Sequence, residues 1–529
     1  MRGTEAFELV LILLALVVAL HWLAKKLHIP PATALLVGGG GLAFIPGLPA
    51  VSLDPELALV LFLPPLLMDG AYGTSLSRFR RHLPGILSLA VGAVIFTTLA
   101  VGLVTHWILP DLPWAACFAL GAIVSPPDAV SAHAVLKGVT LPRRLVALLE
   151  GESLLNDATG LILFRFAVAA TMSGVFHAGE AIQDFLVVAI GGAAVGLALA
   201  GLWILVVRRL GDTTLIVIAT LSMGWIAYLA GEAVHVSGVI ATVAAGLVLS
   251  WNYHTLLSAE IRILGSAVWD IMVFLLEAFV FILIGFSLRG AVERLDMTAG
   301  VPLSMIQLIF GGLLAITIAR FLWIFGAEAV LVLMCRAGVA RARPLGWRQA
   351  TVLGAAGMRG VVTLAVALTL PADMPGRDAM LICAFAVIFA TVVVVVQGST
   401  LGLLIRAVSP EDTDPPAKMD LPATESTMTH ARMIVVEKRA YAPDGTLIHP
   451  LLLEEYHRRV AFMDRYAADS ESTMEGMRPH FDVLLEAIAA ARRKLVEVHR
   501  AGLIEDEVLH ALERDLDVEE MTITFQRDG

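Results

Sequence analysis

One short stretch combines a hydroxyl, carboxylates and an amide within an otherwise apolar segment. Residues 150–160 read Glu-Gly-Glu-Ser-Leu-Leu-Asn-Asp-Ala-Thr-Gly. On a helix Ser153 and Asp157 are four residues apart and share a face, where a hydroxyl and a carboxylate can bind one hard cation together. Glu152 and Asn156 are also four apart but lie on a different face, so Glu152 is free to pair with a cationic side chain. The pattern predicts Asp157 as a site for a cation or a proton.

The segments around this stretch are too apolar for a soluble protein. The chain has 529 residues, 58% of them hydrophobic and 16% charged, with a mean hydropathy of +0.82. Apolar runs of about 20 residues recur, each long enough to cross a hydrocarbon core of roughly 30 Å as a helix. We expect an all-α polytopic membrane protein with about thirteen transmembrane helices. They are expected near residues 7–24, 32–49, 55–75, 84–109, 113–137, 145–172, 182–207, 213–232, 236–251, 264–288, 302–334, 347–370 and 379–406.

Several ionisable residues fall near the middle of these spans. They are Asp69, Asp128, Glu277 and Arg359. A charge facing lipid at the bilayer centre is costly, so such residues indicate a cavity, an ion pair or an ion path. Because a buried arginine needs a counter-charge, we expect Arg359 to pair with Glu152.

Two spans carry helix-breaking residues at their centres. The fifth contains Pro126 and Pro127, which remove backbone donors, and the twelfth contains Gly354, Gly357 and Gly360. Broken helices at corresponding positions of two halves are typical of a transporter binding site, because irregular backbone at membrane depth is tolerated only around a cavity or inside protein. The two spans are separated by an odd number of spans and would run in opposite directions, as an inverted repeat requires. Two incidental kinks in packed helices are the alternative.

The distribution of basic residues predicts the orientation. Positively charged loops face the cytoplasm, and the basic residues fall mostly on alternate connections, which places the N-terminus outside and the C-terminus inside. The basic connections hold Lys25, Lys26, Arg78, Arg80, Arg81, Lys137, Arg143, Arg144, Arg208, Arg209, Arg262, Arg336, Arg341, Arg343 and Arg348.

The C-terminal part differs in composition. Residues 408–529 hold 25 acidic and 14 basic residues, whereas the whole chain has a net charge of −10, so the membrane part is nearly neutral. We expect a transmembrane domain over 1–407, a linker at 409–416 and an acidic cytoplasmic helical domain within 408–529. Apolar residues from Phe481 to Leu495 recur at helical spacing, and Gly502 is placed to end that helix. The tail is either a regulatory or dimer-forming domain or a solvated amphipathic segment.

Several motifs resemble bacterial sodium/proton exchangers of the monovalent cation:proton antiporter family, in the branch with an Asn-Asp motif. The resemblance implies about thirteen helices, arranged as two inverted repeats of about six helices each with crossed discontinuous helices in spans five and twelve. It also implies a homodimer in the bacterial inner (plasma) membrane, with protons and a monovalent cation, Na⁺ first, as substrates. No cofactor is expected, and the acidic charge of residues 408–529 does not suggest a nucleic-acid partner. The motifs lie at residues 63–69, 121–130, 151–157, 279–285 and 357–363.

The resemblance also implies roles for individual residues. Asp157 would carry the cation or the proton, Ser153 would supply a side-chain oxygen, and an arginine matching Arg359 would bridge to Glu152. Asp69 occupies the position of a glutamate that reaches the ion through water.

The chain departs from the family pattern at three places. Asp69 is one methylene shorter than the usual glutamate. Pro127 and Asp128 replace the usual Thr-Asp, so a ligand at this place would be the backbone carbonyl of Pro127. Glu277 stands where many relatives have asparagine, and its role is open. Asn156 matches relatives that are usually electroneutral, which agrees with one carboxylate holding either one proton or one cation.

Two other function classes are weighed against antiport. A membrane-embedded enzyme is disfavoured because residues 151–155 begin like a nucleophile elbow but lack its closing glycine, and the sequence contains neither HExxH nor a P-loop. A cation channel would show no obligatory proton coupling. Arg165, two turns beyond Asp157, is expected to pair with a neighbouring helix or to extend outward rather than to line an ion funnel.

Overall fold

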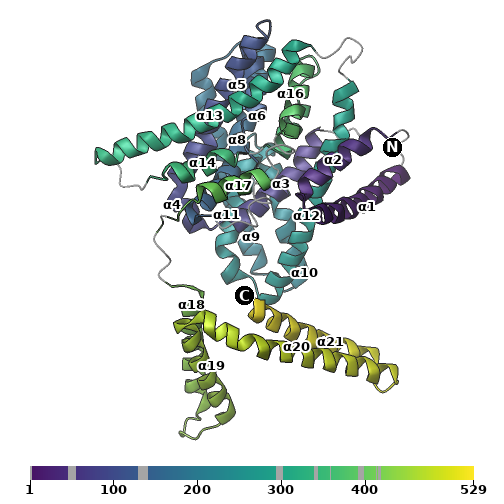
Figure 1. The fold of residues 1–529 in the computed structure, drawn as a ribbon, viewed down its shortest axis with the longest axis vertical. Coiled ribbons are helices and arrows are strands. Elements are labelled where there is room, and N and C mark those ends of the chain that lie inside the picture. The colour runs from purple at the N-terminus through teal and green to yellow at the C-terminus, as the bar shows by residue number, and fades with distance from the viewer. Residues whose placement is uncertain are drawn as a thin grey trace. The chain divides into compact units, whose positions relative to one another are not determined.

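The structure, a computed structural model, describes residues 3–45, 55–128, 141–293, 302–338, 344–357, 359–390, 398–412, 414 and 419–528. Every element named in these ranges is a helix, which confirms the all-α fold (Figure 1). The helices of the apolar part are α1 (Gly3–Leu27), α2 (Pro31–Ala43), α3 (Pro55–Gly73), α4 (Leu76–Leu87), the π-helical η1 (Ser88–Ala93), α5 (Val94–Ile108), α6 (Trp114–Val124), α8 (Arg143–Ser173), α9 (Ala178–Val207), α10 (Thr213–Ala233), α11 (Gly238–Leu256), α12 (Ala259–Glu293), α13 (Leu303–Arg336), α14 (Trp347–Ala355), α15 (Val361–Leu368), α16 (Arg377–Phe389) and α17 (Gly398–Val408).

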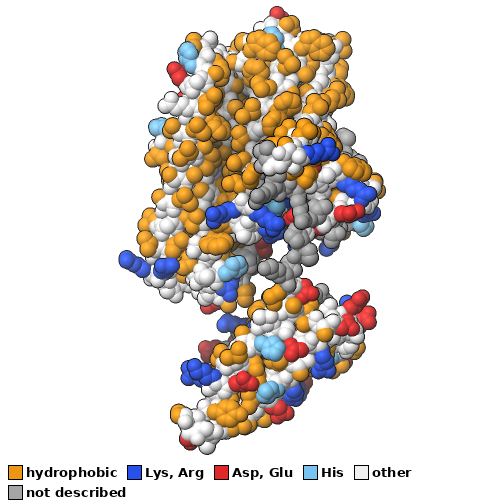
Figure 2. Space-filling model, turned by 90° about the vertical axis from the view of Figure 1, so that its left-hand side faces the viewer, with side chains coloured by type: hydrophobic (Ala, Val, Ile, Leu, Met, Phe, Trp, Pro, Cys, Tyr) orange, Lys and Arg blue, Asp and Glu red, His pale blue; other side chains and the backbone are white. Residues whose placement is uncertain are grey.

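These helices present apolar side chains outward. Trp107 on α5 is 84% exposed, and Ile190 on α9 and Phe310 on α13 are also largely exposed. One face of this apolar part of the chain is covered with hydrophobic side chains (Figure 2). A continuous apolar surface of this size would be unstable in water. Within the described ranges nine helical segments are long and apolar enough to cross a membrane, and α2 and α6 are shorter apolar helices. The chain is therefore a multi-pass membrane protein.

The predicted fifth and twelfth spans contain broken helices. α6 ends at Val124 and is followed by non-helical residues up to Asp128, while the remainder of that span lies outside the described residues. The twelfth span consists of α14 and α15, separated by the stretch around Gly357 and Gly360. The other predicted spans each overlap one helix or more of the described chain. The breaks therefore occur at the prolines and glycines that predicted them.

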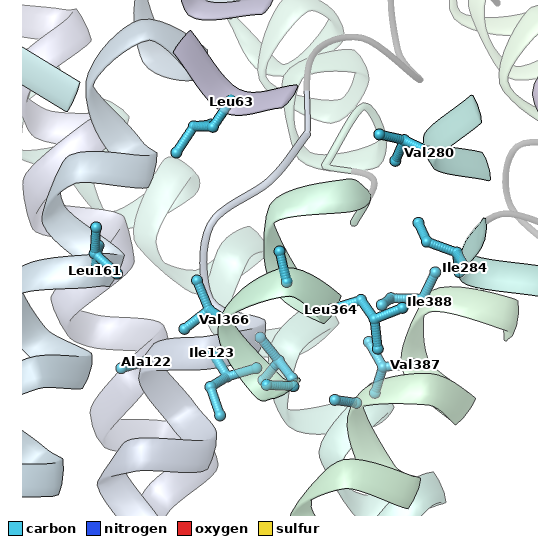
Figure 3. Close-up of a cluster of buried hydrophobic side chains, with 14 of the residues drawn as sticks. Leu63, Ala122, Ile123, Leu161, Val280, Ile284, Leu364, Val366, Val387 and Ile388 are labelled. Carbon is cyan, nitrogen blue, oxygen red and sulfur yellow. The ribbon is translucent and has the colours of Figure 1, made fainter. Parts of the chain in front are cut away.

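The broken helices lie inside the hydrophobic core. α6 packs against α15 and α16, and Figure 3 shows their side chains together with those of α3, α8 and α12. All of these side chains are less than a tenth exposed. The residues labelled there are Leu63, Ala122, Ile123, Leu161, Val280, Ile284, Leu364, Val366, Val387 and Ile388. The irregular backbone is thus surrounded by protein rather than by lipid.

The C-terminal unit consists of two helical hairpins. The helices are α18 (Leu421–Ala440), α19 (Pro450–Ala468), α20 (Ser470–Arg500) and α21 (Asp506–Asp528). α18 packs on α19, and α20 packs on α21 around Phe481, Ile488 and Ile523. Arg492 on α20 forms ion pairs with Asp517 and Glu520 on α21. The predicted helix ends at Arg500, and Gly502 adopts the left-handed conformation with φ of +71°, as its position predicted.

The segment expected as a linker is partly bound to the membrane unit. The chain divides into compact units at Met1–Asp414 and Pro415–Gly529, so the division falls within the expected linker and residues up to Asp414 group with the membrane unit. The reason is an acidic strap, defined here as Glu411, Asp412 and Asp414. Its contacts reach the starts of α8 and α14. Arg143 Nε lies 2.8 Å from Asp412 Oδ2, Arg348 Nη1 lies 3.1 Å from Glu411 Oε1, and Gln349 Nε2 donates to the Glu411 carbonyl at 2.6 Å.

Truncation at two positions tests the strap. A chain ending at Asp414 should keep the thermal midpoint of the membrane unit in detergent, whereas a chain ending at Arg406 loses the strap and should melt at a lower temperature. Exposed ion pairs stabilise by about 0.2–1 kcal/mol each, so the difference is small but measurable. Burial raises the pKa of Asp412, but hydrogen bonds from Arg143 and from the Asp414 amide outweigh this and lower the pKa overall.

The pH dependence provides the control. A carboxyl group whose folded-state pKa is lowered stabilises the fold above its unfolded-state pKa of about 3.9, and this contribution is lost as the pH falls further. The difference in midpoint between the two truncated chains should therefore shrink under acid. Equal midpoints at neutral pH would show that the strap does not stabilise the membrane unit.

Candidate functional site

The break after α6 leaves backbone carbonyl groups without helical partners. Pro126 and Pro127 have no N–H to donate to the carbonyls of Ala122 and Ile123. Ser125 Oγ donates to the Ala122 carbonyl at 3.3 Å and accepts from Thr98 Oγ1 at 3.1 Å. Buried carbonyls are normally paired, so the carbonyls freed at this break are expected to have other donors.

Arg359 supplies the donors for the end of α6. Its Nε donates to the Val124 carbonyl at 3.0 Å and its Nη2 to the Ser125 carbonyl at 3.4 Å, and its Nη1 donates to Gly357. The side chain is buried. A cation at the carbonyl end of a helix also balances the negative end of the helix dipole. Arg359 thus joins the two broken helices to each other.

The predicted Glu152–Arg359 ion pair is wrong. Glu152 forms a bidentate ion pair with Arg320 of α13, with Nη1–Oε1 at 2.6 Å and Nη2–Oε2 at 2.9 Å. Glu152 is 2% exposed and Arg320 is 3% exposed. The two parallel hydrogen bonds match the geometry of guanidinium and carboxylate. Arg359 instead donates to the carbonyls at the end of α6.

Arg320 also serves the second broken helix. Its Nη2 donates to the Leu353 carbonyl near the end of α14 at 3.2 Å, and its Nε lies 3.4 Å from the same oxygen. A Cβ on Gly357 would lie 2.4 Å from Arg320 Cδ and Nε, so glycine is required there for space. Each carbonyl end of the two broken helices is therefore bound by one buried arginine.

Across the break from the end of α14, an acid lies at the N-terminus of α15. A Cβ on Gly360, the residue before α15, would lie 2.7 Å from Asp128 Cβ and 1.8 Å from Asp128 Oδ2. The Asp128 carboxylate therefore rests on the α-carbon of Gly360, at the N-terminus of α15. A negative charge is stabilised at this end of a helix.

α8 carries the remaining polar residues to the break. Asn156 is 0% exposed, and its Nδ2 donates to the Pro127 carbonyl at 2.5 Å. Its Oδ1 is buried and has no hydrogen-bond partner among the described residues. Asp157 is partly buried and lies near enough to Asp128 for the two carboxyl groups to interact electrostatically. The structure thus brings Asn156, Asp157, Pro127 and Asp128 together.

A cavity of about 820 Å³ leads towards this group. Asp69 on α3, Ser153 on α8 and Glu277 on α12 line it. Asp157 is one helical turn beyond Ser153 and is not among the described residues of the lining. Asp69 Oδ1 accepts a hydrogen bond from Trp269 Nε1 at 2.5 Å. Ser153, Asp69 and Glu277 therefore line one cavity, whose α8 wall lies one helical turn from Asp157.

Arg165 forms an ion pair with Glu232 of α10 at 2.9 Å. Both side chains are partly exposed, and neither lines the cavity within the described ranges. The expectation that Arg165 pairs with a neighbouring helix is confirmed.

The sequence profile described as sodium/hydrogen exchanger, transmembrane, matches residues 12–407. This chain belongs to the sodium/hydrogen exchanger family. It is 30% identical to a sodium, potassium, lithium and rubidium/H⁺ antiporter of Bacillus pumilus, covering 96% of this chain and 77% of that protein. An uncharacterised Na⁺/H⁺ exchanger of Mycobacterium bovis is 31% identical, covering 99% of this chain and 97% of that protein.

A solved structure shares the fold. The sodium proton antiporter MjNhaP1 of Methanocaldococcus jannaschii has a TM-score of 0.60 and 20% identity, covering 78% of this chain and all of that one. The exchanger fold and the resemblance inferred from the motifs are confirmed.

The sequence reasoning assigned no role to two residues of this exchanger. Arg320 lies in the middle of a long apolar span, so the cost of burying a charge could have identified it as a partner of Glu152. Trp269 gave no such signal, because a tryptophan in a transmembrane segment is ordinary.

Removal of Arg320 tests the ion pair. Arg320→Ala leaves Glu152 buried without its partner, a change that typically costs about 3–5 kcal/mol. We expect a large loss of monodisperse exchanger in detergent size-exclusion chromatography. Glu152→Leu combined with Arg320→Met should recover part of it, because neither charge remains. Glu152→Leu combined with Arg359→Ala should give no more monodisperse protein than Arg320→Ala does. Recovery of the yield in this double variant, and not in Glu152→Leu with Arg320→Met, would contradict the assignment.

Gly360 tests the contact between the broken helices. In Gly360→Ala the new Cβ must displace Asp128 from the N-terminus of α15, and overpacking of this kind costs about 1–3 kcal/mol. The thermal midpoint and the cation-driven proton flux should both fall. Gly201→Ala on α9 is the matched control, since no atom lies within 4 Å of the added Cβ. An unchanged midpoint in Gly360→Ala would show that Asp128 does not occupy this place.

Proposed function

We propose that this chain is a secondary antiporter in which one proton and one monovalent cation, Na⁺ first, compete for Asp157. The observation that carries the proposal is the position of Asp157, one turn beyond the Ser153 wall of the cavity and beside the break after α6. Membership of the exchanger family gives cation/proton exchange as the class of activity.

The chemistry follows from the surroundings of Asp157. Burial disfavours the ionised form of a carboxyl group, so Asp157 is stabilised either by a proton or by a cation at the same oxygens. Binding of one expels the other, and exposure of the occupied site to each side in turn gives exchange. Ser153 and the Pro127 carbonyl are proposed as further ligands, with Asp69 and Glu277 on the approach.

The neighbouring polar groups support an electroneutral exchange. Asn156 cannot carry a proton in this cycle, and its amide is bound to the Pro127 carbonyl. Asp128 is proposed to remain ionised at the N-terminus of α15, where the helix dipole stabilises it. Asp157 is then the one carboxyl group whose occupancy alternates.

The cavity supports the orientation expected from the loops. It is lined by the end of α3, the start of α10, the end of α11 and the start of α12, which adjoin the basic residues Arg208, Arg209 and Arg262. Because basic loops face the cytoplasm, we propose an inward-open exchanger of the bacterial inner membrane, with its tail in the cytoplasm. We also propose a homodimeric assembly, as the family resemblance implies.

The cation range is part of the proposal. The Bacillus pumilus relative is named for sodium, potassium, lithium and rubidium. Flux in proteoliposomes should therefore be measured with each of these cations, with and without a membrane potential. An exchange rate independent of the potential would support one-for-one exchange, and cation current without proton movement would indicate a channel.

Asp157→Asn tests the mechanism. Asparagine has nearly the same shape and needs no counter-charge, so the protein should insert and fold while both cation and proton movement cease. Asp157→Glu should retain partial activity with an altered apparent affinity. Asp184→Asn, which removes an exposed acid of α9, should behave as wild type. Sodium-dependent proton flux near the wild-type rate in Asp157→Asn would disprove the mechanism.

A further inference from the structure

Asp69, an acid in the cavity wall, accepts a hydrogen bond from a tryptophan. Trp269 Nε1 on α12 donates to Asp69 Oδ1 on α3 at 2.5 Å, and both residues line the cavity. The hydrogen bond therefore connects two helices along the route to Asp157. Its functional meaning rests on the proposed exchange of a cation through this cavity.

The indole is held in place by an aromatic cluster. Trp269 stacks on Tyr72, with ring centroids 6.3 Å apart and an interplanar angle of 26°. Tyr72 in turn meets the edge of Tyr253 on α11, with centroids 5.1 Å apart. Ser250 Oγ donates to the Tyr72 carbonyl at 2.8 Å, which ties α11 to α3. Stacked rings of this kind restrict rotation of the indole, so its N–H stays directed at Asp69.

Asp69 lies close to the level of Ser153 on α8. A Cβ on Gly70, the next residue, would lie 3.2 Å from Leu154, which follows Ser153. Asp69 and Ser153 therefore line the same part of the cavity, and Asp157 follows Ser153 by one helical turn.

We propose that Trp269 is a positioning residue that weakens cation binding at Asp69 and so keeps this acid a transit site. The hydrogen of the indole N–H carries partial positive charge and occupies one oxygen of Asp69. A cation at the same oxygen must share it with that hydrogen or displace it. Transport requires that a site on the path bind strongly enough to admit the ion and weakly enough to release it. With Asp69 restrained in this way, tight binding is reserved for Asp157.

Trp269→Phe separates this role from packing, because it keeps an aromatic ring beside Tyr72 and removes the N–H. In Na⁺-driven proton flux of the full chain in proteoliposomes, we expect the KM for Na⁺ to fall by about threefold to tenfold. We expect kcat to fall as well, because a tighter site on the path releases the ion more slowly. In the Asp69→Asn background the same substitution should have no effect on KM, because the amide oxygen carries no charge to attract the cation.

Trp225→Phe is the matched control. Trp225 Nε1 donates to the Leu61 carbonyl of the same helix α3 at 3.2 Å, and Trp225 is not among the described residues of the cavity lining. Its loss removes an indole hydrogen bond to α3 without touching Asp69, and the KM for Na⁺ should stay at the wild-type value.

The Na⁺-induced rise in thermal midpoint in detergent gives a second reading, because a ligand that binds the folded state raises its stability. Trp269→Phe should reach its full rise at a lower Na⁺ concentration than wild type. An unchanged or raised KM, or an equal shift in the Asp69→Asn background, would overturn the proposal. Absence of flux in the wild type would instead defeat the proposed exchange, and the Na⁺ dependence of the midpoints would then decide the role of Trp269 alone.

Discussion

The structure depends on the pairing of backbone carbonyl groups in the middle of a membrane. A helix that stops there leaves carbonyls without helical partners, and each buried unpaired group costs free energy. Arg359 binds the carbonyls at the end of α6, and Arg320 binds that of Leu353 in α14. Arg320 is itself neutralised by Glu152. Non-helical backbone can therefore persist beside the cavity because two buried guanidinium groups satisfy it.

The same constraint positions the polar residues of α8. Asn156 donates to the Pro127 carbonyl, and Gly160 leaves room for the Pro126 ring, to which a Cβ would come within 2.3 Å. These two contacts fix the register of α8 against the break. Asp157 lies between them in sequence, so it is held beside Asp128 whatever the shape of the cavity further out. A longer side chain at residue 160 would separate α8 from the break.

The helices that form the site are also linked at their other ends. α8 begins at Arg143, and α14, which leads to Arg359, begins at Trp347. The acidic strap binds Arg143 of α8 and both Arg348 and Gln349 of α14. The two helices are thus joined near the site by buried hydrogen bonds through Arg320 and at their ends by exposed polar contacts with the strap. The exposed pairs are individually weaker, so the interior contacts carry more of the energy that holds α8 and α14 together.

The sequence by itself determined the class of fold, the positions of the broken helices and most of the residues at the site. Apolar length shows a membrane helix, and proline or glycine at mid-span shows a break, because both effects are local. The partners of the charged residues were decided only by the tertiary structure. Spacing placed Glu152 and Arg359 at similar depth, but depth does not say which of two arginines can reach a carboxylate. Arg320 reaches Glu152 with both terminal nitrogens of its guanidinium. Arg359 instead donates to carbonyls that lack helical partners because α6 ends where it does. The contact between Trp269 and Asp69 was likewise invisible in the sequence, since it joins two helices whose rotation about their axes is set by packing.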